Sequence, residues 1–226
     1  MHAPIRALIA FRPKASVGLI GGAAAVSSMF AATPFLVPAI ADRHGVPLGT
    51  AGLISVAQVA GFTIANLVAG RIVRPRVALL IPTAAALASV NAASAWAGSF
   101  GLLLALRGVA GVAAGLITWL AWIDAMSEPG IMRDVAGAGP LMALVTAPLF
   151  GWLAFAGRDP VIFLFLTVLA ALPILLPARL ASQTVPGRRR VSPSRSNLVL
   201  LGALGIATLA GSSLFVFSAA MARTRI

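Results

Sequence analysis

The sequence predicts an all-α integral membrane protein, and three observations support this fold class. Seven apolar stretches fill most of the 226 residues, and each is long enough to cross a bilayer core, which takes roughly 20 helical residues. Hydrophobic residues make up 60% of the chain and charged residues 10%. The apolar runs are continuous, whereas membrane β-strands alternate over segments of about ten residues. The stretches span residues 17–41, 49–70, 77–97, 101–125, 135–156, 160–178 and 198–220.

The first three stretches are delimited by glycine and proline. Stretch 17–41 carries Gly18 and Gly21 among many small residues, which allow helices to pack closely in a membrane. Pro47 stands just before the second stretch, and proline suits the first turn of a helix. Pro75 precedes the third stretch and marks the connection before it.

Two of the next three stretches follow a recognisable connection. Segment 96–100 is uncharged and aromatic, as is typical of a membrane interface, and it leads into stretch 101–125. Stretch 135–156 contains Pro148, at which we expect the fifth helix to break. The turn sequence at 157–160 leads into the sixth stretch.

These elements divide the chain into four segments. A cytoplasmic basic tail covers 1–16, and a six-helix transmembrane bundle covers 17–178. A basic linker rich in proline and serine covers 179–197, and a seventh transmembrane helix with a short tail covers 198–226. Because the linker separates it from the other stretches, we expect the seventh helix to stand apart from the bundle or to pack at its rim.

The distribution of basic residues predicts the orientation. With the N-terminus inside, twelve Arg and Lys residues fall on the cytoplasmic side and four on the other, while Arg107 lies within a helix. The positive-inside rule therefore predicts a cytoplasmic N-terminus and a periplasmic C-terminus in a bacterial inner (cytoplasmic) membrane. The net charge of +12 follows from this topology, and we interpret the run at 188–190 as a topology determinant that contacts anionic lipid. Nucleic acid is not an expected partner.

The inventory of reactive side chains argues against an enzyme. The chain has no cysteine, and its two histidines, His2 and His44, lie in a tail and a turn. No stretch offers paired carboxylates for acid–base catalysis or a cluster of metal ligands, so we expect neither catalysis nor a metal or cofactor. All the acidic residues lie near helix ends, and no carboxylate is expected inside the bundle. They are Asp42, Asp124, Glu128, Asp134 and Asp159.

Arg107 is the charged residue that lies deepest in the predicted bundle. It stands about seven residues into the fourth stretch, roughly 10 Å along a helix axis. A charge at that depth costs at least about 2.5 kcal/mol, so Arg107 must face the bundle or a water-filled cavity. Its expected partners are backbone carbonyls, amide side chains or an anionic ligand. Two roles stay open, a structural tether between helices and a substrate-binding or proton-coupling residue.

Uncharged polar residues and glycines mark further positions of interest. Three amide side chains lie at membrane depth, namely Gln58, Asn66 and Asn91. Each is expected either to form hydrogen bonds between helices or to contact a substrate. Gly108, Gly111 and Gly115 follow one another on the fourth stretch. Their spacing gives a face of small residues against which another helix can pack.

Three motifs stand in the order found in the N-terminal half of a major facilitator superfamily transporter. Gly70-Arg71-Ile72-Val73-Arg74-Pro75-Arg76 resembles the basic loop motif between helices 2 and 3 of that family, without the motif's acidic residue and second glycine. Leu106-Arg107-Gly108-Val109-Ala110-Gly111 resembles the helix 4 motif. Gly137-Ala138-Gly139-Pro140 resembles the glycine–proline motif in helix 5 of exporters.

The resemblance covers roughly residues 15–220 and implies a fold and several roles. The fold is a six-helix bundle equal to half of such a transporter, with a seventh transmembrane helix added. The inner-gate loop that it implies contains Gly70, Arg71, Arg74 and Arg76. The helix 4 arginine is associated in the family with proton coupling and with contact to helix 1, which implies this role for Arg107. Gly139 and Pro140 would serve helix packing.

The chain departs from the family in containing only one half. Family members have two six-helix halves that hold the substrate between them, whereas this sequence has seven stretches. Two functions in the lipid bilayer therefore stay open. One is secondary, proton-coupled transport of a small solute by a protein that is truncated or works with a second half-transporter. The other is a transport-inactive structural or assembly subunit, packed against a partner membrane subunit of a photosynthetic or respiratory complex.

Overall fold

The computed structural model describes residues 13–181 together with 199 and 203. In this part the chain is helical and contains no strand. The elements are α2 (Val17–His44), α3 (Leu48–Ala51), α4 (Leu53–Ile72), η1 (Val77–Leu79), α5 (Leu80–Ala95), α6 (Phe100–Ala125), α7 (Pro129–Phe155) and α8 (Asp159–Leu175). The linker predicted at 179–197 and the seventh helix predicted at 198–220 lie almost wholly outside the described residues.

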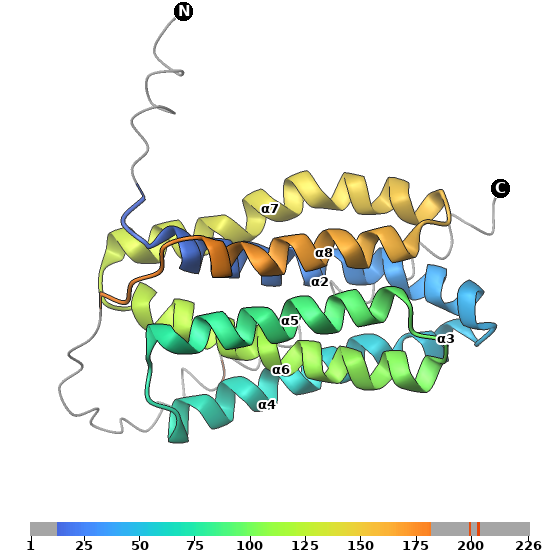
Figure 1. The fold of residues 1–226 in the computed structure, drawn as a ribbon, viewed down its shortest axis with the longest axis horizontal. Coiled ribbons are helices and arrows are strands. Elements are labelled where there is room, and N and C mark those ends of the chain that lie inside the picture. The colour runs from blue at the N-terminus through green and yellow to red at the C-terminus, as the bar shows by residue number, and fades with distance from the viewer. Residues whose placement is uncertain (1–12, 182–198, 200–202, 204–226) are drawn as a thin grey trace, which may run out of the picture.

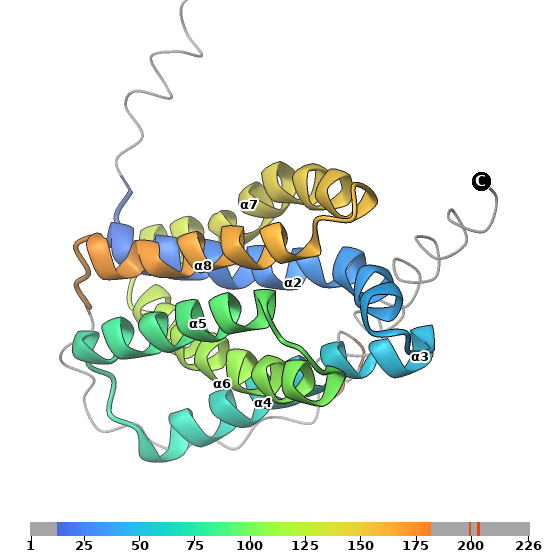
Figure 2. The same cartoon turned by 45° about the vertical axis from the view of Figure 1, so that its right-hand side comes forward.

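The long helices lie side by side, and successive helices run in opposite directions (Figure 1). The connections therefore gather at two ends of the bundle, which Figure 2 shows from a second angle. The proximal end holds the start of α2, the α4–α5 and α6–α7 connections and the end of α8. The distal end holds the α2–α3, α5–α6 and α7–α8 connections. Short connections between antiparallel neighbours impose this arrangement.

Five elements of the described part are long and apolar enough to cross a membrane. They are Val17–His44, Leu48–Ile72, Val77–Ala95, Phe100–Ala125 and Pro129–Phe155. Helix α3 belongs to the same span as α4, from which only Gly52 separates it. Helix α8 is apolar but shorter, with 17 residues. These helices indicate a multi-pass membrane protein, which confirms the all-helical membrane character predicted from the sequence.

The helices of the fifth and sixth stretches, α7 and α8, differ from their predicted bounds. Helix α7 begins at Pro129 rather than near 135 and continues through Pro140 and Pro148. Pro129 stands in the first turn, where the missing N–H has no helical partner to lose. The expected break at Pro148 was wrong, because neighbouring helices and local adjustments let membrane helices tolerate proline. Helix α8 ends at Leu175 because Leu176 is extended.

The two helix triplets, α2-α4-α5 and α6-α7-α8, pack on each other in a symmetric pattern. The most extensive contacts join α4 to α6, α5 to α8 and α2 to α7. Helix α2 also packs on α8, α6 on α5, and α2 on α6. Exchanging α2 with α6, α4 with α7 and α5 with α8 maps this set of contacts onto itself. The second triplet starts at the opposite end of the bundle (Figure 1), so the exchange corresponds to a twofold axis lying across the helices.

Glycine allows the close contact between α4 and α6. Gly111 lies directly against the backbone carbonyl of Gln58, and Gly108 contributes its own carbonyl to the same contact. A methyl group on Gly115 would lie 2.6 Å from the carbonyl oxygen of Phe62, which is too close for any side chain. Gly111 and Gly115 of the predicted packing face therefore lie where the two backbones touch, as small residues permit in membranes. A Cβ on Gly108 would meet nothing within 4 Å, and the glycine required beside its carbonyl is Gly61 of α4.

Candidate functional site

Arg107 lies in the interior of the bundle, with only 1% of its surface exposed. Its Nη2 donates hydrogen bonds to Asn91 Oδ1 at 2.8 Å and to Ser94 Oγ at 3.0 Å. Its guanidinium carbon lies 5.1 Å from the centre of the Phe163 ring, which is a cation–π arrangement. We call these four residues the Arg107 cluster. Through them α6 is joined to both α5 and α8.

The sequence of α5 explains how one helix offers two acceptors to the same guanidinium. Asn91 and Ser94 are three positions apart and therefore share a helix face. Ser94 Oγ donates its own hydrogen to the Val90 carbonyl at 2.7 Å, which leaves its lone pairs for Arg107. Asn91 Nδ2 donates to the Leu166 carbonyl of α8 at 3.5 Å, a long bond. This contact orients the side-chain oxygen of Asn91 toward Arg107.

The hydrogen-bonding capacity of the guanidinium is only partly used. Within the described residues, Arg107 Nε and Nη1 have no hydrogen-bond partner. A buried donor without a partner costs about 1–3 kcal/mol, and more when the group is charged. Arginine stays protonated in proteins, so Arg107 provides a fixed positive charge with two unpartnered donor nitrogens, Nε and Nη1. Such a group can bind water or a small anionic group.

The other predicted amide residues lie apart from this cluster. Gln58 is buried on α4, and its Nε2 donates to Thr33 Oγ1 of α2 at 3.3 Å. Asn66 Nδ2 donates to the Phe62 carbonyl of its own helix at 2.9 Å. Asn91 is therefore the predicted amide that the structure brings together with Arg107. The family resemblance implied that Arg107 contacts the first helix, which is α2 here. In the Arg107 cluster its partners lie on α5 and α8 instead.

Gly139 and Pro140, the last residues of the glycine–proline motif in α7, lie in different surroundings. Gly139 faces α2, where a methyl group added to it would lie 2.8 Å from Ser27 Oγ. Pro140 is exposed on the outside of the bundle. Gly139 therefore contributes to the α2–α7 contact, whereas Pro140 points away from it.

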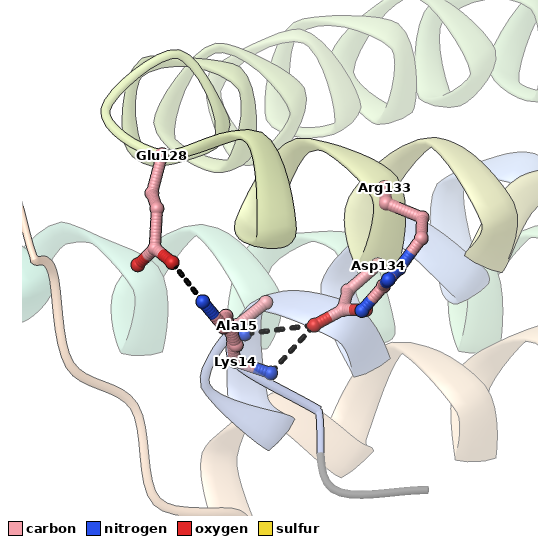
Figure 3. Close-up of polar contacts among 5 residues, drawn as sticks. All are labelled: Lys14, Ala15, Glu128, Arg133 and Asp134. Atoms are coloured by element: carbon pink, nitrogen blue, oxygen red, sulfur yellow. Dashed lines mark hydrogen bonds and ion pairs between the residues drawn. The ribbon is translucent and has the colours of Figure 1, made fainter.

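At the proximal end, the start of α7 holds the segment that enters α2 (Figure 3). Asp134 is buried, and its Oδ2 accepts hydrogen bonds from the N–H groups of Lys14 at 2.6 Å and Ala15 at 3.1 Å. Lys14 Nζ forms an ion pair with Glu128, and Arg133 Nε lies 3.6 Å from Asp134 Oδ1. A carboxylate beside the first turn of α2 also suits the helix dipole.

Asp124 holds the segment that leaves α8. Its Oδ1 accepts a hydrogen bond from the Ala181 N–H at 2.6 Å, and its side chain is buried. Four of the acidic residues lie at helix ends, whereas Asp134 lies inside α7. The expectation that the bundle buries no carboxylate was wrong for Asp124, Asp134 and Asp159. Backbone N–H groups and cations satisfy these carboxylates, which offsets the cost of removing them from water.

The distal end is held together by Arg43, near the end of α2. Its Nη1 lies 3.0 Å from Asp159 Oδ2 at the start of α8. Its Nη2 donates to the carbonyl groups of Ala95 at 3.0 Å and Ala97 at 3.3 Å, at the end of α5. Arg43 thus joins all three distal connections, a role that the sequence did not single out.

A pocket of about 730 Å³ opens at the distal end. It is lined by Ala39, Asp42, Arg43, Ala154, Phe155, Gly157 and Asp159. Two of these lining residues, Arg43 and Asp159, form the ion pair described above. Because its lining includes no member of the Arg107 cluster, the pocket is a separate feature.

The predicted inner-gate loop lies at the proximal end. Gly70 and Arg71 end helix α4, and Arg74 and Arg76 lie in the connection to η1. All three arginines are exposed, and none of them forms an ion pair within the described residues. We call this segment, residues 70–76, the α4–α5 corner.

Sequence reasoning missed two members of the Arg107 cluster. Ser94 could have been found, because it stands three residues after Asn91 and forms a polar face with it on an apolar helix. Phe163 gives no such signal, since it is one of 11 phenylalanines in an apolar chain.

Comparison with protein-family models, with curated proteins and with solved structures finds no match to this chain. Among the described residues, no group of three or more His, Cys, Asp or Glu side chains could hold a metal ion. The function is therefore argued from the arrangement of the helices and from the Arg107 cluster.

Proposed function

We propose that this chain is a six-helix unit of the major facilitator type, whose function is secondary, proton-coupled transport of a small solute across a bacterial inner membrane. The observation that carries the proposal is the symmetric packing of the two helix triplets: exchanging α2 with α6, α4 with α7 and α5 with α8 leaves the set of main helix contacts unchanged. Each six-helix half of a major facilitator transporter is built from two inverted three-helix repeats. The contacts of α2, α4 and α5 with α6, α7 and α8 follow the same relation.

Arg107 supports the proposal through its charge and its depth. Ionisable residues within membrane helices typically mark substrate or ion pathways. Since arginine does not release its proton, Arg107 would act as a fixed positive charge rather than as the proton carrier. Because only 1% of its surface is exposed, the surrounding helices would have to separate before it could bind an anionic group of the solute or a carboxylate presented by a second bundle. The free Nε and Nη1 donors are suited to this role.

A transporter of this type needs a second six-helix bundle, because the substrate is held between two halves. A second copy of this chain or a partner half-transporter would supply it. The exposed arginines of the α4–α5 corner favour a cytoplasmic proximal end, hence a cytoplasmic N-terminus and a periplasmic C-terminus. The α4–α5 corner would then act at the inner gate.

Proton flux in reconstituted vesicles tests the proposal. The purified full chain is placed in vesicles that contain a pH-sensitive dye, and a panel of amino acids, sugars and carboxylates is added under an imposed proton gradient. We expect at least one solute to cause acidification that wild-type protein supports and the Arg107→Ala variant does not. Arg158→Ala, which changes an exposed arginine at the distal end, serves as the control and should keep the flux.

The alternative, a transport-inactive subunit, predicts a different result. Wild-type protein would then move no solute and would purify within a larger membrane complex. The Arg107→Ala variant would assemble poorly with that complex. Gel filtration of the protein extracted from its native membrane, run alongside the flux measurement, distinguishes these outcomes.

A further inference from the structure

The α4–α5 corner concentrates positive charge that the described chain does not neutralise. Arg71, Arg74 and Arg76 lie within one short segment, and all three side chains are exposed. Within the described residues none of them has an acidic partner. Like charges held close together repel one another. A counter-charge from outside this part of the chain would therefore be bound favourably.

An outward-facing apolar surface leads directly to this corner. Leu67, Val68 and Ile72 of α4 are exposed, and Ile72 is 75% exposed. At the same level Trp119 lies beside Gly70, its indole nitrogen 3.8 Å from where a Cβ of that glycine would stand. Trp119 is buried in the hydrophobic core, so the side of α4 that carries the exposed residues faces away from α6. The positive charge thus begins where the lipid-facing surface ends.

The α6–α7 connection, at the same proximal end, has a different charge balance. There Lys14 is paired with Glu128, and Arg133 lies beside Asp134. Acidic and basic side chains neutralise each other within the chain. Among the described residues of this end, the α4–α5 corner therefore holds three unpaired arginines, and the remaining one is Arg179 after α8.

We propose that the α4–α5 corner binds the phosphate of an anionic phospholipid headgroup, with the acyl chains lying along the exposed face of α4. Guanidinium groups bind phosphate through charge-assisted hydrogen bonds. Basic residues at the cytoplasmic membrane surface attract anionic lipid in the same way. The inference does not depend on the proposed transport function, because it follows from charge, exposure and the adjoining apolar surface.

Lipid retention by the full-length protein tests this site. The protein is equilibrated with phosphatidylglycerol and phosphatidylcholine of matched acyl chains, and bound lipid is measured by native mass spectrometry. Wild type should retain phosphatidylglycerol in preference to phosphatidylcholine. The variant Arg71→Gln/Arg74→Gln/Arg76→Gln should bind phosphatidylglycerol more weakly by about five-fold per arginine, on the order of a hundred-fold in total. High salt should weaken the wild-type preference.

A matched control removes the same charge from other exposed positions. The variant Arg133→Gln/Arg158→Gln/Arg179→Gln changes three exposed arginines outside the corner and should retain phosphatidylglycerol as wild type does. Equal losses in the two variants would show unspecific attraction and overturn the proposal, as would full retention by the corner variant. Complete displacement of the lipid by inorganic phosphate would also overturn it, since a free-anion site does not need the acyl chains. Circular dichroism of each variant separates lost binding from lost folding.

Discussion

The two helix contacts α5–α6 and α2–α8, which the exchange of triplets relates, are built from different chemistry. At α5–α6, the buried Arg107 binds Asn91 and Ser94. At α2–α8, Gly18 lies against the segment that follows α8 and donates its N–H to the Pro177 carbonyl at 3.0 Å. The α5–α6 contact buries a charged side chain within the bundle. The α2–α8 contact has charged side chains only at its distal end, where Arg43 pairs with Asp159, and close backbone approach at its proximal end.

This difference indicates that the bundle geometry does not itself demand a charge at α5–α6. Between its two ends, the α2–α8 contact contains no charged side chain. Arg107 instead carries an insertion cost of at least about 2.5 kcal/mol and keeps two donor nitrogens, Nε and Nη1, without partners among the described residues. Residues that break the local rules of a fold are expected at functional sites, and the comparison favours such a role for Arg107.

The largest effect on stability is expected at the contact that relies on glycine. A Cβ on Gly18 would lie 2.9 Å from Ala178 Cβ and 3.1 Å from the Leu176 carbonyl oxygen. Gly18→Leu must therefore push α2 away from the end of α8, and we expect a loss of about 3 kcal/mol. The free energy of unfolding can be measured by titration with denaturing detergent, using tryptophan fluorescence.

Gly137→Leu is the control for that substitution. An added Cβ at Gly137 meets nothing within 4 Å, so the change should alter stability by no more than about 0.5 kcal/mol. Similar losses for the two variants would mean that the α2–α8 contact is not closely packed.

At the charged contact, Arg107→Ala should cost about 2 kcal/mol. The substitution removes the hydrogen bonds to Asn91 and Ser94 and leaves buried polar groups without their partner. The same detergent titration measures the loss, with the exposed Arg158 changed to alanine as a reference. A stability equal to that of wild type would be incompatible with a buried, hydrogen-bonded Arg107.

A smaller effect is expected at the proximal end. Asp134→Asn keeps an oxygen for the N–H groups of Lys14 and Ala15 but removes the charge that strengthens these bonds, so we expect a loss of about 1 kcal/mol. Amide hydrogen exchange at Lys14 and Ala15 should become faster. Glu128→Gln alters a solvent-exposed ion pair instead and should change stability by less than about 0.5 kcal/mol. Unchanged exchange in Asp134→Asn would contradict the tethering of α2.

The sequence predicts the spanning helices well because the length of an apolar run is a one-dimensional property. The prediction fails at the start of the fifth helix, because the charged residues Arg133 and Asp134 were placed outside the stretch 135–156. Arg133 and Asp134 lie inside α7, since the carboxylate of Asp134 binds the entry to α2 rather than water. A buried carboxylate of this kind depends on contacts with a distant part of the chain, which no local pattern reveals.

The candidate site could be predicted in part for a related reason. Arg107 and Asn91 are conspicuous as polar residues in apolar helices, so their pairing could be expected. The contributions of Phe163 and Arg43 depend on how the helices are rotated and where their ends meet. The inner-gate and transport roles assigned from family resemblance stay predictions.

The central claim is that the Arg107 cluster serves function rather than the fold. It is tested most directly by the free energy of unfolding of a variant whose α5–α6 contact is fully apolar. The variant Arg107→Met/Asn91→Leu/Ser94→Ala removes the charge together with its hydrogen-bonding partners. Replacing a buried polar network by apolar residues of similar volume is often neutral or stabilising by about 1–4 kcal/mol. We therefore predict a free energy of unfolding equal to or above that of wild type. A loss as large as that of Arg107→Ala would contradict the account and show that the cluster holds the bundle together.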